Sequence, residues 1–107
     1  MANTFKNAHG EAAASSTVVY TCPGATTAII FAGSFSNIDG TNEVAVTVET
    51  VDTSASTTKT VHSALPIPIK DTYSLDSKIV LEATDTIKVS AGATGDVDYT
   101  LSILEIS

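Results

Sequence analysis

The sequence contains no tryptophan and no arginine, and it has a single cysteine among its 107 residues. Because Cys22 is alone, no intramolecular disulfide can form and a metal site built from several cysteines is excluded. Twelve acidic residues stand against five lysines, which gives a formal net charge of -7. Since phosphate backbones and anionic membranes are bound by clustered Lys and Arg, we expect neither nucleic acid nor a membrane as a partner.

Long apolar runs are also missing. Residues 1–10 lack the continuous apolar core of a secretory signal, and no segment approaches the roughly 20 apolar residues of a membrane span. We therefore expect the chain to be made in a cytoplasm and to stay soluble until it meets its partners.

The content of hydrophobic residues, 43%, is that of a packed globular protein, and the length suits one domain. Residues 1–16 show no sustained periodicity, and we interpret them as an extended N-terminal arm that precedes a domain over residues 17–107. In this arm Phe5 is the apolar anchor and Lys6 a charge contact, both expected to bind a neighbouring protein. The alternative is an arm that folds back on its own domain.

Short β-branched runs separated by turn residues dominate the chain from Thr17 onward. This pattern is typical of an antiparallel β-sandwich, of jelly-roll or immunoglobulin-like type, with about seven strands and no helix. Strands are expected near residues 17–22, 28–36, 43–49, 58–64, 78–81, 86–90 and 97–106. The runs 78–81 and 86–90 resemble the two arms of a hairpin.

Alternation along these strands selects the residues of the core, because one face of each strand must be buried. The predicted core consists of Val44, Val46, Val48, Ile79, Leu81, Ile87, Val89, Val97, Tyr99 and Leu101. In the second strand, Ile29, Phe31 and Phe35 are expected on one face, with Gly33 at a bulge or a close backbone approach.

Two prolines interrupt the segment 65–69, Leu-Pro-Ile-Pro-Ile. Proline cannot donate a hydrogen bond to a neighbouring strand, so the segment is predicted to be an edge strand or an extended stretch. The side chains of Leu65, Ile67 and Ile69 are then expected to be exposed and to need a partner or a packing surface.

Nucleophilic catalysis needs a nucleophile, a base and an orienting acid within hydrogen-bond reach. Cys22 and His62 are the one conceivable pair, yet Cys22 precedes a proline within an apolar alternation and has the character of a small core residue. We therefore expect no catalytic residues, no cofactor and no enzyme activity.

Carboxylates offer two further possibilities. Paired acids for glycoside hydrolysis would have to come from Asp39, Glu43, Glu49, Asp96 and Asp98. These residues fall mostly in turns or on solvated strand faces, and the sequence supplies few aromatics for sugar stacking. Calcium would need loop oxygens from Asp39, Asn42, Asp96 or Asp98, but this spacing is a weak signal, and we predict no metal site.

Five segments spread along the chain carry a resemblance to a known class of protein. They are residues 1–8 (MANTFKNA), 19–24 (VYTCPG), 64–68 (ALPIP), 78–83 (KIVLEA) and 101–106 (LSILEI). In these segments the sequence resembles small virion structural proteins of tailed bacteriophages, particularly those of marine and cyanobacterial phages.

The resemblance implies a non-enzymatic virion protein made in the host cytoplasm. The first expectation is a capsid decoration or cement subunit that binds the outside of the major capsid protein lattice. The alternatives are an accessory subunit of the tail, neck or fibre base, or a lectin-like glycan-binding module. A homo-oligomer is expected, and the resemblance makes a trimer the first choice.

Overall fold

The computed structural model describes residues 3–39, 41–75, 78–92 and 96–107, and these residues form nine strands and no helix. The strands are β1 (Asn3–Glu11), β2 (Thr17–Thr21), β3 (Thr27–Asn37), β4 (Val44–Asp52), β5 (Thr57–Ile67), β6 (Thr72–Ser74), β7 (Ile79–Leu81), β8 (Thr86–Ala91) and β9 (Val97–Ile106). They make two antiparallel sheets packed as a sandwich, as the sequence predicted.

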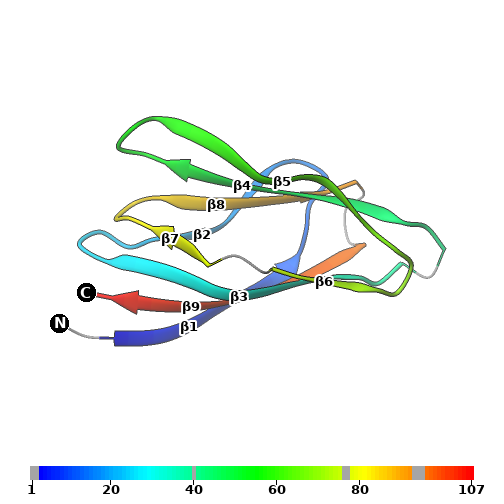
Figure 1. Cartoon of the computed structure of the whole chain (residues 1–107), viewed down its shortest axis with the longest axis horizontal. Helices are drawn as coiled ribbons and strands as arrows, with labels where there is room; N and C mark the ends of the chain where they lie inside the picture. The colour runs from blue at the N-terminus through cyan, green and yellow to red at the C-terminus, as the bar shows by residue number, and fades with distance from the viewer. Residues whose placement is uncertain (1–2, 40, 76–77, 93–95) are drawn as a thin grey trace.

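One sheet has the order β1-β9-β3-β6, with β7 also paired to β3, and we call it sheet A. The other, sheet B, has the order β2-β8-β4-β5. Figure 1 shows sheet B in the upper half of the view and sheet A in the lower half, with β1 at its outer margin. The edge strands β1 and β2 therefore belong to one side of the sandwich, and β5 and β6 to the other.

The core between the sheets follows the predicted alternation. Of the ten predicted core residues, all are buried except Ile79 and Tyr99, which are partly buried and pack against the core. The interior also contains Cys22, Ile30, Phe35 and Ile103, each nearly inaccessible to solvent. The predicted role of Cys22 as a small core residue is thus confirmed.

The expected single face of Ile29, Phe31 and Phe35 is wrong. The pairing of β3 with β9 shifts register between Ile30 and Ala32, so Phe31 is an extra residue in a β-bulge. Because the bulge reverses the alternation, Ile30 and Phe35 both point into the core, and Phe31 stays exposed. Gly33 lies at a close approach, since a Cβ there would stand 3.0 Å from Leu101 Cδ2.

The predicted hairpin of residues 78–81 and 86–90 does not form. β7 pairs with β3 in sheet A, whereas β8 pairs with β2 and β4 in sheet B. The connection bends because Asp85 N donates to Glu82 O and the Asp85 carboxylate accepts from Glu82 N. The chain therefore crosses from one sheet to the other at this turn.

The N-terminal segment is a strand in this structure. Residues Asn3–Glu11 form β1, which pairs with β9 from Ile106 to Asp98 without a break in register. The connection to β2 runs between the sheets, where Ala12 is buried and its amide donates to Val97 O. Residues Asn3–Glu11 of the expected arm thus form the edge strand of sheet A. This agrees with the alternative of a segment folded onto its own domain.

The proline-containing segment ends β5, an edge strand of sheet B, as predicted. Its side chains are not equally exposed. Ile67 is 1% exposed and belongs to the core, which corrects its predicted availability, because it pairs with the inward-facing Val44. Leu65 is half-buried, and Ile69 lies beyond the strand and is exposed.

We expect Leu101→Ala to lower the free energy of unfolding by about 2–5 kcal/mol, because the fully buried side chain would leave a cavity beside Gly33. The matched control is Leu104→Ala on the same strand, where the side chain points to the outer face and is only half-buried. Urea unfolding of both variants measures the difference. Equal losses for the two variants would contradict the assignment of faces on β9.

Candidate interaction surface

A row of apolar side chains crosses the outer face of sheet A. The register pairs Phe5 of β1 with Leu104 of β9, Leu104 with Ile29 of β3, and Ile29 with Val80 of β7. Since directly paired residues share a face, these four side chains lie side by side on the solvent side of four adjacent strands. We call them the apolar row.

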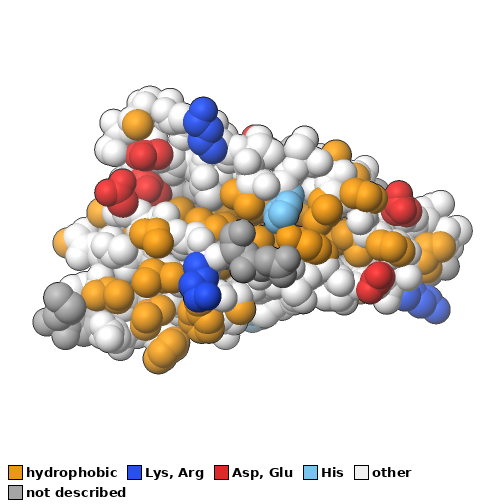
Figure 2. Space-filling model, viewed as in Figure 1, with side chains coloured by type: hydrophobic (Ala, Val, Ile, Leu, Met, Phe, Trp, Pro, Cys, Tyr) orange, Lys and Arg blue, Asp and Glu red, His pale blue; other side chains and the backbone are white. Residues whose placement is uncertain are grey.

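The row is exposed to solvent at both ends. Phe5 is 74% exposed and Val80 is 61% exposed, and Phe31, at the bulge, adds a further side chain that is 41% exposed. The rings of Phe5 and Phe31 meet edge to face with centroids 6.1 Å apart. Figure 2 shows hydrophobic side chains gathered at the lower left of the molecule, where β7, β3, β9 and β1 lie in Figure 1.

The residues that flank the row on β1, β9 and β3 are uncharged. Those paired on either side of it are Asn3, Asn7, Thr27, Ala32, Ser102 and Ile106. On the same face Glu11 and Asp98 pair with each other at the far end of β1. The Val80 end of the row is charged, since Val80 lines a hollow together with Asp52, Lys59, Glu82 and Asp85. Exposed apolar side chains gathered in one place, such as those at the Phe5 end, are typical of a surface that another molecule covers.

A buried carboxylate fixes β1, and with it Phe5, at the edge of the sheet. Glu105 is 8% exposed and points between the sheets. One of its oxygens lies 3.3 Å from Lys6 Nζ of β1, and the other accepts a hydrogen bond from the Tyr20 hydroxyl of β2. The three side chains join sheet A to sheet B at this edge, so Lys6 has a partner within its own chain.

The opposite edge of the sandwich is joined by His62 of β5 and Tyr73 of β6. The hydroxyl of Tyr73 lies 2.8 Å from His62 Nε2, and Tyr73 also stacks on Phe35 of the core. Cys22 has a different partner, because its thiol donates to the Thr26 carbonyl, and burial raises the pKa of that thiol. The structure therefore does not assemble the conceivable pair of Cys22 and His62.

Three acids meet at one end of the molecule, where oxygens of Asp52, Glu82 and Asp85 lie within 4.8 Å of one another. Asp85 accepts hydrogen bonds from the amides of Thr53 and Glu82, and Asp52 accepts from Ser54 and Ala55. The hydrogen bonds from Ser54 and Ala55 lower the pKa of Asp52. The Asp52 and Asp85 carboxylates thus hold the turn after β4 and the turn before β8, which gives these two acids a structural role.

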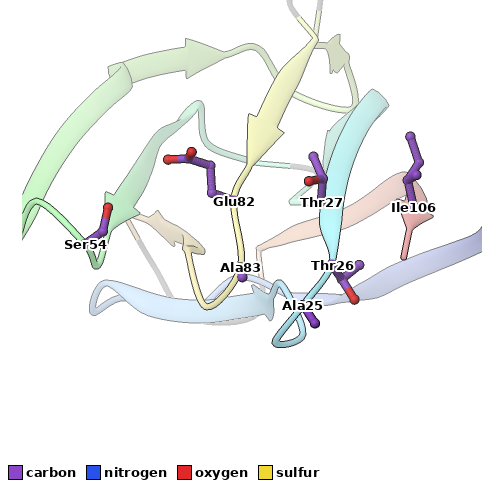
Figure 3. Close-up of a pocket in the computed structure, with 7 residues that line it drawn as sticks. All are labelled: Ala25, Thr26, Thr27, Ser54, Glu82, Ala83 and Ile106. Carbon is purple, nitrogen blue, oxygen red and sulfur yellow. The ribbon is translucent and has the colours of Figure 1, made fainter. Parts of the chain in front are cut away.

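Beside this cluster lies an open hollow of about 400 Å³, drawn in Figure 3. The hollow is lined by Ala25, Thr26, Thr27, Ser54, Glu82, Ala83 and Ile106. Figure 3 shows these side chains on separate turns and strand ends, without convergence on a common point. Its lining offers hydroxyl groups and one carboxylate, and no arrangement that specifies a ligand.

The acids considered for calcium or glycoside chemistry are distributed over the molecule. Asp39 accepts from the Thr41 amide, which lowers the pKa of Asp39, and the Asn42 side chain donates to its other oxygen. Asp96 lies beside the same loop, where its carbonyl accepts the Ile38 amide. Glu49 sits opposite Lys88 on the outer face of sheet B.

Asp98 is on the outer face of sheet A, and Glu43 is exposed before β4. The acids weighed as calcium ligands are thus only partly neighbours.

Comparisons with protein-family models, curated proteins and solved structures found no match to this chain. Within the described residues no helix is long and apolar enough to cross a membrane.

Of the predicted partner-binding residues, Phe5 and Ile69 are exposed, while Lys6 and Ile67 are engaged within the chain. Sequence reasoning missed Val80, Leu104, Ile29 and Phe31 as surface residues. The signal was present in part, because the run Ile79–Leu81 is apolar at all of its positions and one side of a half-buried strand must then be exposed.

We expect the contact between Tyr20 and Glu105 to make stability depend on alkaline pH. Burial first, and then the Glu105 carboxylate, raise the pKa of the Tyr20 hydroxyl above its ordinary value. A raised pKa favours the neutral phenol in the folded chain, so its contribution is complete below about pH 10 and is lost as the pH rises through the folded-state pKa.

Urea unfolding below and above about pH 10 measures this dependence. Tyr20→Phe, which cannot ionise, is expected to lose less stability over the same interval than the unsubstituted chain. The comparison removes the contributions that the two proteins share. Parallel losses in the two proteins would show that Tyr20 has no such role.

Proposed function

We propose that the chain is a non-enzymatic structural subunit of a tailed-bacteriophage virion, where it decorates or cements the outside of the major capsid protein lattice. The observation that carries the proposal is the apolar row on the outer face of sheet A, whose flanking residues on β1, β9 and β3 are uncharged. The sequence resemblance to small virion proteins supports the particle as the place where that face is covered.

The distribution of charge favours this face as the one that meets the lattice. The chain carries a net charge of -7, so most of its surface repels other acidic surfaces. The part of the row on β1, β9 and β3 can approach a flat apolar surface without bringing carboxylates close to it, whereas Glu82 lies beside Val80. Burial of a large apolar side chain contributes about 1.5–3 kcal/mol. Burial of the exposed Phe5 and Val80 side chains would therefore contribute to the free energy of binding between each subunit and the lattice.

The rigidity of the row suits a subunit that binds a fixed lattice. The four side chains belong to four hydrogen-bonded strands. The edge strand β1 is held in addition by the Lys6–Glu105 contact. Little conformational entropy is therefore lost when the face is covered. The accessory subunit of a tail, neck or fibre base would use the same face, and the location in the particle separates these possibilities.

The test uses particles of the phage whose genome carries this sequence, prepared without the subunit. Purified protein should sediment with such particles and remain bound to tailless capsids. Val80→Ser should weaken binding by about tenfold or more, because it removes an exposed end of the row. Val18→Ser is the matched control, because Val18 is an exposed valine on sheet B.

Two results would count against the proposal. The first is absence of the protein from purified particles by mass spectrometry, together with no sedimentation of added protein. The second is an equal effect of Val80→Ser and Val18→Ser on binding. If isolated tails retain the protein and capsids do not, the subunit belongs to the tail or neck.

A further inference from the structure

The four edges of the two sheets are protected unequally against pairing with another strand. β5 contains Pro66, two shifts of register against β4, and Ala64 in the left-handed conformation. β2 is short and carries a register shift, and β6 and β7 have three residues each. Prolines, bulges and short length are the devices that keep edge strands from associating.

β1 has neither short length, proline nor bulge, and its charged side chains are Lys6, which is paired with Glu105 of its own chain, and Glu11. Its nine residues pair with β9 in an unbroken register, and the strand contains neither proline nor a bulge. All its side chains except Ala8 and Gly10 are exposed. One half of its backbone amides and carbonyls faces β9, and the other half lies at the open edge of sheet A, visible at the margin of the molecule in Figure 1.

We propose that β1 pairs antiparallel with β1 of a second copy of this chain, across a twofold axis perpendicular to sheet A. The result is one continuous sheet with the order β6-β3-β9-β1-β1-β9-β3-β6. Both apolar rows then lie on the same face of this sheet. The inference concerns the isolated chain and does not rest on the proposed virion role.

The register of this pairing follows from the sequence of β1. Paired residues must share a face, and the register that joins all nine residues places Asn7 opposite Asn7 of the second copy. Phe5 then lies opposite His9 of the second copy, and Lys6 opposite Ala8. No like charges face each other, whereas a register centred on Lys6 would oppose two lysines.

The charge of β1 and the area of its open edge both bear on whether a second copy of the chain can bind there. β1 holds one lysine and one glutamate, so two acidic molecules can meet here without opposing carboxylates. An edge about 30 Å long and about 10 Å wide presents only about 300 Å² per copy. Since stable interfaces bury about 1,200 Å² or more in total, we expect a dimer that depends on concentration.

A cysteine on the axis tests the pairing directly. The two copies of residue 7 would have Cα atoms about 4.5–5.5 Å apart, which is within the range of a disulfide. Asn7→Cys should therefore form a covalent dimer under mild oxidation. Thr60→Cys, an exposed position on the opposite edge strand β5, is the matched control and should form little, and the unsubstituted chain should form none because Cys22 is buried.

Sedimentation equilibrium supplies the second measurement. The unsubstituted chain should pass from monomer to dimer as its concentration rises. Asn7→Asp sets two carboxylates opposite each other on the axis and should raise the dissociation constant severalfold, whereas the uncharged Asn7→Thr should retain association. Circular dichroism checks that both variants keep the β fold.

Three outcomes would overturn the inference: a chain that is monomeric at every concentration, a trimer without a dimer, and equal cross-linking at residues 7 and 60. Failure of this pairing leaves binding to capsids unaffected, because Val80 lies at the far end of the apolar row from β1. The two proposals therefore fail separately.

Discussion

The Glu105 carboxylate imposes the constraint on which the position of β1 depends. A carboxylate placed between two sheets loses its hydration, and it is tolerated only where charged or hydrogen-bonding partners replace the water. Lys6 and Tyr20 supply these partners from β1 and β2, the edge strands of the two sheets. The N-terminal segment is thus tied to the sandwich by this polar contact and by its backbone pairing with β9, since its own side chains bury little apolar area.

The placement of β1 also completes the outer face of sheet A. Without β1, the row would end at Leu104, and Phe31 would have no aromatic neighbour across β9. The two outer faces of the sandwich then differ in character. Sheet B presents Glu49 and Lys88 to solvent at its centre, whereas the corresponding part of sheet A presents aliphatic and aromatic side chains.

Much of the fold could be predicted from the sequence, because alternation reports burial directly. Val44, Val46 and Val48 are a clear example, and all three are buried. Sheet membership could not be predicted in the same way. The Glu82–Asp85 turn, with Thr84 in the left-handed conformation, does lie between the two predicted runs. A turn does not show whether the strands on its two sides pair with each other or belong to different sheets, and the expected hairpin failed for that reason.

The interaction surface was less accessible to sequence reasoning than the core. Phe5 was identified as an exposed apolar residue, but its neighbours on the surface are 24 to 99 positions away along the chain. Such neighbours are defined only by strand register. β1 itself lacks alternation because both of its faces are largely exposed, so the pattern that identifies half-buried strands does not apply to it.

The bulge at Phe31 separates the requirements of the core from those of the surface. With Phe31 left out, the residues of β3 would alternate regularly, and Ala28, Ile30, Phe35 and Asn37 would still face inward. Related chains that differ in length by one residue at this point can therefore share an identical interior and present different exteriors. Evolution can adjust the partner of such a domain through an insertion or deletion, without repacking a single buried side chain.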